Sequence, residues 1–405
     1  MAKISDLSDE LLVKILSFLP TKVAVSTSVL SKQWMFIWMW LPKLEFRFSD
    51  PSKYACLRDF IDKNLPLHKA PIIESLYLRS LCGLLQPEDM KSWVGIAVSR
   101  YVRELSIKYF SYDRSDVLPC SLYRCKSLVT LKLIGQKILV DVPPTVYLPS
   151  LKTLQLLCVI YLNEESLGLL LSCCAVLEDL SIDRDCNDNV KALVVVVPSL
   201  QRLTLTIDQG CSADGYVIVT PSLKYFNLVD DRNESSIEHM HMPELEEADI
   251  SLTEDIAKNI EMLFKSITTV KRLSLNMLFN GRKKTVHRDG IVFSQLEDLK
   301  LYICSPNWSK LLVHMLKHSP NLQILNLLLG DPFIGDYTNY EPVRWNNQSS
   351  VPKCFLNSLE TFKFEGYDSG EAEDRDFLSF IFKHARCLKS TSIVHRCTYD
   401  FMFHN

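Results

Sequence analysis

A short apolar motif recurs along most of this chain and constrains its fold more than any other feature. The motif has the form L-x-x-L-x-L, and successive copies between Ile73 and Leu322 begin 22 to 29 residues apart. A repeat of this kind is a unit that buries its apolar face only against its neighbours, so the units must stack. The copies start at Ile73, Val102, Leu128, Leu151, Leu177, Leu200, Leu223, Leu245, Val270, Leu296, Leu322, Leu359 and Leu388.

The period lies in the range of leucine-rich repeats. Each L-x-L ending alternates apolar and polar residues, as a half-buried strand requires, so the polar positions of successive strands are expected to align on one face of a sheet. A varied polar row of this kind suits recognition better than catalysis. We therefore expect target contacts from Lys132, Gln155, Thr204, Asn227, Lys300 and Asn326.

Between the strands the apolar period becomes helical in several places. One helix is predicted after Asn163, with its inward face at Leu167, Leu170, Leu171 and Cys174, and others are predicted after Thr253 and Ser305. Strand, turn and helix in repetition predict an α/β solenoid with the shape of a horseshoe. An unrelated α/β core would not sustain this period.

Composition excludes several function classes. The 45 basic and 48 acidic residues give a formal net charge of -3, which does not favour nucleic acid or an anionic membrane as a general partner. The 13 cysteines include no C-x-x-C pair, which indicates free thiols in a reducing compartment. No apolar run is long enough to cross a bilayer. We expect a protein of the cytoplasm or nucleus, or of both.

No motif for catalysis or cofactor binding is present, so we expect no catalytic residues, no cofactor and no metal site. His314 and His318 are four residues apart, but they are expected to share an outward helix face with Lys310 and Lys317, which disfavours a metal ion. Two charged stretches are interpreted as solvated loops, with a nuclear import signal or an anionic ligand site as the alternative for the basic one. They are the basic run Arg282, Lys283, Lys284 and Arg288, and the acidic run Glu371, Glu373, Asp374 and Asp376.

Residues 4 to 41 have helical periodicity. Ser8 is placed to cap a first helix that Pro20 ends, Thr21 is placed to cap a second, and a third is expected from Ser31 around Trp34. About forty residues cannot bury so many large side chains among themselves, so part of this apolar surface is expected to meet a partner. Periodicity alone leaves a second interpretation open, in which the helices cap the first repeat.

The string LSDELLVKILSFLPTKVAVSTSVLSKQWMFIW resembles an F-box, most closely in its LSDELLVKIL, SFLPTK and VLSKQW segments. F-boxes dock onto a Skp-type adaptor, which binds a cullin scaffold that carries the ubiquitin-transfer machinery. Ser8 departs from the family, which usually has proline there. The resemblance implies that the adaptor is bound by Leu7, Leu11, Ile15, Leu16, Leu19, Pro20, Val23, Leu30 and Trp34.

The C-terminal segments VPKCFLNSLETFKFEGY and ARCLKSTSI resemble the FBD domain of plant F-box/FBD/LRR-repeat proteins. Here we expect a strand, an acidic loop from Asp368 to Asp376, a helix and a final strand that together cap the solenoid. The predicted domains are an F-box at 1–48, the leucine-rich-repeat solenoid at 49–345 and the FBD domain at 346–405.

These resemblances imply a substrate-recognition subunit of a Skp–cullin–F-box ubiquitin ligase, with an unknown target protein on the solenoid and FBD region. The alternative is an adaptor-independent leucine-rich scaffold or small-molecule sensor, in which the helices only cap the repeats. A third hypothesis, an enzyme with a site on the sheet, has no motif behind it.

Overall fold

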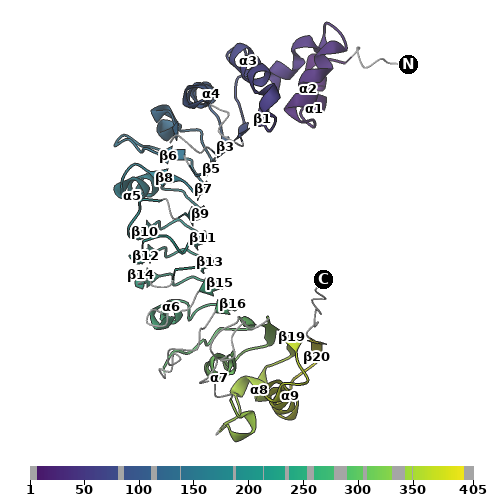
Figure 1. Cartoon of the computed structure of the whole chain (residues 1–405), viewed down its shortest axis with the longest axis vertical. Helices are drawn as coiled ribbons and strands as arrows, with labels where there is room; N and C mark the ends of the chain where they lie inside the picture. Colours follow the sequence, from purple (N-terminus) through teal and green to yellow (C-terminus); the bar gives the residue numbers. More distant parts are fainter. Residues whose placement is uncertain are drawn as a thin grey trace, which may run out of the picture. The chain divides into compact units, whose positions relative to one another are not determined.

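The computed structural model describes residues 7–80, 86–110, 116–136, 138–185, 188–212, 214–232, 237–252, 260–277, 290–303, 308–330, 343–348 and 350–395. The chain forms two compact units, the first of residues 1–200 and 210–212, and the second of residues 201–209 and 213–405. In each unit the consecutive repeats contribute parallel strands to a sheet (Figure 1).

The first unit begins with short helices. Ser8 occupies the predicted N-cap of the first helix, with φ -65° and ψ 153°, but its hydroxyl makes no capping hydrogen bond. The third predicted helix is instead a 3-10 helix, η3, which starts at Trp34. The elements are α1 (Asp9–Leu16), α2 (Thr21–Ser26), η2 (Thr27–Val29) and η3 (Trp34–Trp40).

Six parallel strands of the first unit follow one another in register. Figure 1 shows α4 and α5 on one side of them. The predicted helix after Asn163 is confirmed as α5. The elements are β1 (Lys43–Phe48), η4 (Pro51–Lys53), α3 (Tyr54–Asn64), β2 (Ser75–Ser80), α4 (Pro87–Ser99), β3 (Glu104–Tyr109), η5 (Cys120–Arg124), β5 (Thr130–Ile134), β7 (Thr153–Leu157), α5 (Glu165–Ser172) and β9 (Asp179–Arg184).

Several connections between repeat strands contain a short strand instead of a helix. The sequence analysis does not predict these short strands. Three of them pair in parallel in the first unit, and the second unit has a similar pair. These connections contain short runs rich in β-branched and aromatic residues, for example ILV and YVIV, which favour strands over helices. The strands are β4 (Asp116–Val117), β6 (Ile138–Val140), β8 (Ile160–Tyr161) and β10 (Leu193–Val196) in the first unit, and β12 (Tyr216–Val219) and β14 (Ile237–His241) in the second.

The second unit continues the parallel pattern through eight repeat strands. The predicted starts at Thr253 and Ser305 lie outside the described residues, but the helices that follow them are present as α6 and α7. The elements are β11 (Arg202–Ile207), β13 (Tyr225–Asp230), β15 (Glu247–Leu252), α6 (Ile260–Ser266), β16 (Arg272–Met277), β17 (Asp298–Ile303), α7 (Trp308–His318), β18 (Ile324–Leu329), η7 (Trp345–Asn347), α8 (Lys353–Asn357), β19 (Thr361–Tyr367), α9 (Ala372–His384) and β20 (Ser390–His395).

The leucines of the motif form the core, as predicted. In the first unit Leu131, Leu154 and Leu180 stand side by side in register, and each is fully buried. Burial of one leucine side chain contributes about 1.5–3 kcal/mol. A backbone bond repeats with the motif: the Arg103 carbonyl oxygen accepts hydrogen bonds from the backbone N–H groups of both Val129 and Thr130 at the start of the next repeat. The solenoid prediction is therefore confirmed within each unit.

The C-terminal region extends the sheet of the second unit, because β19 pairs with β18 and β20 pairs with β19. Aromatic side chains fill its core. The Phe377 ring of α9 lies 4.6 Å from the Trp345 ring and 5.8 Å from the Phe362 ring, measured between centroids. Trp345 itself forms part of η7 and is buried.

Two predictions about charged residues are wrong. The acidic loop ends earlier than expected, because α9 begins at Ala372, and Asp374 is buried and accepts a hydrogen bond from the Asp368 backbone N–H at 3.0 Å. His314 is buried as well and does not face outward, because α7 packs that face against its neighbours. The basic run Arg282, Lys283, Lys284 and Arg288 lies outside the described residues.

Candidate functional site

Helix α1 has apolar side chains on two faces. Its inner face places Leu12 and Leu16 in the core with no exposed surface. Its outer face leaves Leu11 49% and Ile15 38% exposed, at a spacing of four residues that keeps them in one stripe, and Leu19, in the turn after the helix, is 37% exposed. An apolar stripe that the module itself does not cover is a typical protein-binding surface.

Further apolar side chains extend this exposed set beyond α1. Val23 of α2 is 45% exposed and Leu30 is 64% exposed, and both are among the residues predicted to bind the adaptor. The sequence analysis missed Phe18 and Val29, which are 80% and 87% exposed. Their positions next to the predicted residues were the signal available. We call Leu11, Ile15, Phe18, Leu19, Val23, Val29 and Leu30 the docking set.

Two of the predicted adaptor-binding residues lie inside the module. Leu16 is fully buried and Trp34 is 4% exposed, so both stabilise the fold that presents the docking set. The neighbouring Gln33 side chain donates a hydrogen bond to the Leu7 backbone oxygen at 3.0 Å and thereby ties η3 to the start of α1. Leu7 is half-buried and Pro20 is exposed at the N-cap of α2.

The polar positions of the repeat strands form a row in each unit. In the first unit Lys132 of β5 stands next to Gln155 of β7. Both side chains are half-buried, between fully buried leucines of the same strand. The predicted phase of these strands is therefore correct, and both side chains lie on the face opposite the core.

In the second unit the other four predicted target-contacting residues lie on one longer row. Thr204 stands next to Asn227, and Lys300 stands next to Asn326. Asp249 and Ser274 separate these two pairs. The row therefore contains neutral, acidic and basic groups, an arrangement suited to recognition of a complementary surface.

Contacts along this second row fix its polar groups. The Tyr225 hydroxyl donates a hydrogen bond to the Asp249 carboxylate at 2.8 Å, and the Lys300 ammonium lies 4.5 Å from the Tyr302 ring centroid. A hollow of about 190 Å³ opens between Asn227, Asp249 and Tyr302. Asn227, Asp249 and Ser274 line it together with Tyr302, but most of its lining surface is apolar.

The described residues give little support for catalytic chemistry. Within them, no three His, Cys, Asp or Glu side chains are grouped so that they could hold a metal ion. Burial raises the pKa of the Cys174 and Cys354 thiols to about 12, so neither is a thiolate at neutral pH. Across the same residues, no helix is long and apolar enough to span a membrane.

Comparison with known proteins gives matches along most of the chain. The family model of the F-box domain matches residues 4–46, and the family model of FBD matches residues 346–393. The family model of the leucine-rich repeats of FBD-associated F-box protein At5g56370 matches residues 90–258. The putative FBD-associated F-box protein At5g56700 of Arabidopsis thaliana is 66% identical over 397 residues, which are 98% of each chain. The chain belongs to the family of FBD-associated F-box proteins.

Other members of this family from Arabidopsis thaliana support the same assignment. FBD-associated F-box protein At5g60610 is 56% identical over 399 residues, covering 98% of this chain and all of the relative. Putative F-box/FBD/LRR-repeat protein At4g00315 is 47% identical, covering 98% of this chain and 94% of the relative. Along this chain the matched models follow one another in the order F-box, repeats and FBD. The predicted family and the predicted α/β repeat architecture are confirmed.

The predicted domain boundary at residue 48 coincides with the end of β1. This strand pairs with β2, and its Phe48 ring stacks on Trp93 of α4 with 5.7 Å between centroids. The Lys69 backbone N–H also donates a hydrogen bond to the Met39 carbonyl oxygen at 2.8 Å. The end of the predicted F-box domain therefore packs against the first repeats.

Proposed function

We propose that this protein is the substrate-recognition subunit of a Skp–cullin–F-box ubiquitin ligase. The docking set binds the Skp-type adaptor, through which the chain joins the cullin. The polar rows of the two units bind a target protein. The chain itself supplies no catalytic group and accelerates ubiquitin transfer by holding the target near the transfer machinery.

The docking set is the observation that carries this proposal. Leu11, Val29 and Leu30 are each about half or more exposed in a module whose own core is complete, since Leu12, Leu16 and Trp34 already fill it. A helical cap that only closed the first repeat would turn its large apolar side chains inward. Membership of the F-box family gives this exposed surface a partner class.

The proposal is tested in plant cells in which the proteasome is blocked. Proteins captured on the full chain are compared with those captured on the double variant Leu11→Asp/Leu30→Asp. We expect both chains to retain the same target, because the polar rows are unchanged, and we expect ubiquitin on the target only with the wild-type chain. Equal ubiquitin on the target with both chains would support the scaffold alternative.

A further inference from the structure

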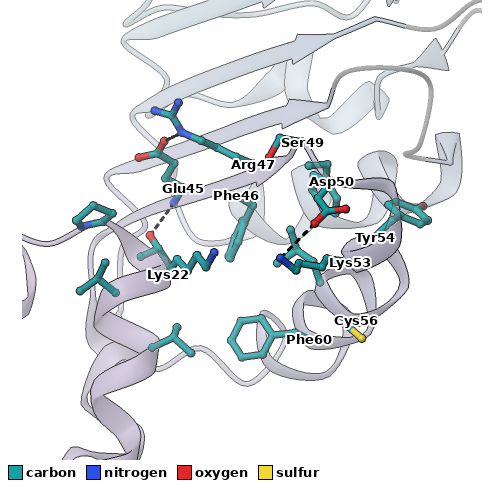
Figure 2. Close-up of a pocket in the computed structure, with 16 residues that line it drawn as sticks. Lys22, Glu45, Phe46, Arg47, Ser49, Asp50, Lys53, Tyr54, Cys56 and Phe60 are labelled. Atoms are coloured by element: carbon teal, nitrogen blue, oxygen red, sulfur yellow. Dashed lines mark hydrogen bonds and ion pairs between the residues drawn. The ribbon is translucent and has the colours of Figure 1, made fainter.

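A cavity of about 650 Å³ lies in the first unit between α2, β1 and α3 (Figure 2). Its walls are mainly apolar and include Val25 and Leu57, and Val23 of the docking set borders it. Figure 2 shows the Phe46 ring of β1 and the Phe60 ring of α3 directed into the same space. A mainly apolar cavity of this volume is in the size range of ligand-binding sites.

One side of this cavity is the open edge of a strand. β1 is the end strand of the sheet, and the Ser75 backbone N–H donates to the Pro42 carbonyl oxygen at 3.2 Å. Because successive residues of a strand direct their backbone groups to opposite edges, Glu45 and Arg47 direct theirs away from β2.

Helix α2 provides a hydrogen-bond partner for only one of these backbone groups, the Glu45 N–H. The Thr21 hydroxyl oxygen accepts a hydrogen bond from the Glu45 N–H at 2.8 Å. Among the described residues, the Arg47 N–H and the carbonyl oxygens of Glu45 and Arg47 have no hydrogen-bond partner. A strand edge with free backbone groups is a template for another strand.

The surroundings of this edge carry net positive charge. Arg47 pairs with Glu45, and Lys53 pairs with Asp50 at 3.2 Å. Lys22 has no carboxylate within ion-pair distance among the described residues, and Figure 2 shows its ammonium group directed into the cavity.

Two further cations lie beside Arg47 on the face with the polar row. The strand register places Arg79 of β2 next to Arg47, and Lys108 of β3 next to Arg79. Adjacent strands are about 4.8 Å apart, so these three residues form a basic ladder at the end of the sheet. Within it Arg47 is paired with Glu45, whereas no ion pair joins Arg79 or Lys108 to another described residue. An acidic segment would be attracted both here and at Lys22.

We propose that the open edge of β1 binds an extended acidic segment of the target protein by strand addition. Backbone hydrogen bonds to Arg47 hold the segment, its acidic side chains lie beside the basic ladder, and its alternate apolar side chains enter the cavity. The inference rests on the proposed role of the chain as a target-binding subunit.

The register favours the target over the adaptor as the source of this segment. Glu45 of β1 stands next to Tyr77 of β2. Tyr77 in turn stands next to Ser106 of β3, and Ser106 stands next to Lys132 of β5. The cavity residue Glu45 therefore begins the polar row of the first unit. A segment added to β1 becomes the next strand of the same recognition surface.

The test uses the full chain and two blocked, fluorescein-labelled hexapeptides that alternate valine with glutamate or valine with lysine. We expect the glutamate peptide to bind, and the lysine peptide to bind at least about tenfold more weakly. Lys22→Glu should weaken binding of the glutamate peptide by about tenfold. Equal affinity of both peptides, or no binding of the glutamate peptide at about 1 mM, would overturn the proposal.

Two variants at one position separate strand addition from simple charge attraction. Arg47→Pro removes the N–H that points into the cavity and leaves the pairing with β2 intact, whereas Arg47→Ala removes the same side chain but keeps the N–H. The glutamate peptide should bind Arg47→Pro about tenfold more weakly than Arg47→Ala. Should Arg47→Pro unfold, hydrogen–deuterium exchange on the wild-type chain decides, because the peptide must slow exchange of the Arg47 amide. An unchanged exchange rate, or equal affinity of the two folded variants, would contradict strand addition.

The same peptide titration in the presence of saturating Skp-type adaptor shows whether the bound segment comes from the target or from the adaptor. An unchanged peptide affinity supports a target site, and competition assigns the edge to the adaptor and overturns the proposal. Because the peptide is measured on the chain alone, its failure leaves adaptor docking untouched. Failure of adaptor docking likewise leaves the peptide result interpretable.

Discussion

Truncation of two exposed leucines should separate adaptor docking from folding. Leu11 and Leu30 are 49% and 64% exposed, so a partner that covers them removes about half of each side chain from water. Full burial of a leucine contributes about 1.5–3 kcal/mol, so Leu11→Ala with Leu30→Ala forfeits roughly 2–3 kcal/mol of binding free energy. This corresponds to about 25- to 150-fold weaker adaptor binding.

The assay is isothermal titration calorimetry of the full-length chain with a purified Skp-type adaptor, alongside thermal unfolding of each variant. The double variant should unfold within about 0.5 kcal/mol of the wild-type chain, because neither side chain is in the core. Leu67 provides a matched control, since it is a leucine that is 65% exposed outside the F-box helices. Leu67→Ala should change neither quantity.

Leu16→Ala gives the opposite result in the same assay. Leu16 is fully buried, so its truncation should destabilise the folded chain by about 2–5 kcal/mol and weaken docking only through loss of the module. Wild-type affinity for the Leu11→Ala/Leu30→Ala variant would refute the assignment of the docking set. A large loss of affinity in Leu67→Ala would refute it as well.

Three further predictions concern other parts of the chain. Ser8→Pro should keep or raise both the melting temperature and the adaptor affinity relative to Ser8→Ala, because Ser8 already has φ -65° and makes no capping bond; a lower melting temperature would show that its N–H is needed. Lys132→Glu and Lys300→Glu should reduce target capture in pull-downs and shift the free energy of unfolding by no more than about 0.5 kcal/mol; larger shifts in both would contradict their half-buried placement. Burial, followed by the nearby Arg100 guanidinium, lowers the pKa of His68 to about 4, so the folded state favours neutral imidazole and loses stability as pH falls below about 6.5. Denaturant unfolding should therefore show about 2 kcal/mol less stability at pH 5 than at pH 6.5, a loss that His68→Gln reduces and that His239→Gln, at an exposed histidine, leaves unchanged; equal losses in both would exclude His68 as the source.

The sequence predicts the repeat strands well because their signal is local. Each L-x-L pair is apolar at alternate places, and even the degenerate copies at Leu245 and Leu388 form β15 and β20. The sequence analysis does not predict β1, although Leu41, Leu44 and Phe46 follow the same spacing, because they fall within the predicted F-box domain at 1–48. The local signal of a repeat strand is nevertheless present in them.

The orientation of the F-box side chains, in contrast to the repeat strands, cannot be predicted from the local sequence. Leu11 and Leu12 are adjacent leucines in one helix, yet one is half exposed and the other is fully buried. The apolar stripe of α1 covers both faces, so periodicity cannot tell which face packs against η3. Only the tertiary contacts between α1 and η3 decide this, and they depend on residues more than twenty positions away, such as Gln33 with Asp9.

The open edge of β1 could not be predicted from side-chain patterns either. Whether the Arg47 N–H is free depends on the pairing of β1 with β2 and on where Thr21 stops covering the strand. Both are backbone relations between separate elements. Sequence patterns thus locate the strands, whereas exposure of their edges follows from the packing of neighbouring elements.

The central claim is that this chain binds a Skp-type adaptor through its F-box helices. The most direct measurement is size-exclusion chromatography with light scattering of the purified full-length chain mixed with purified Skp-type adaptor. The account predicts a one-to-one complex with the wild-type chain and separate species with Leu11→Asp/Leu30→Asp, both chains being folded by circular dichroism. Separate elution of the folded wild-type chain from every adaptor paralogue would contradict it.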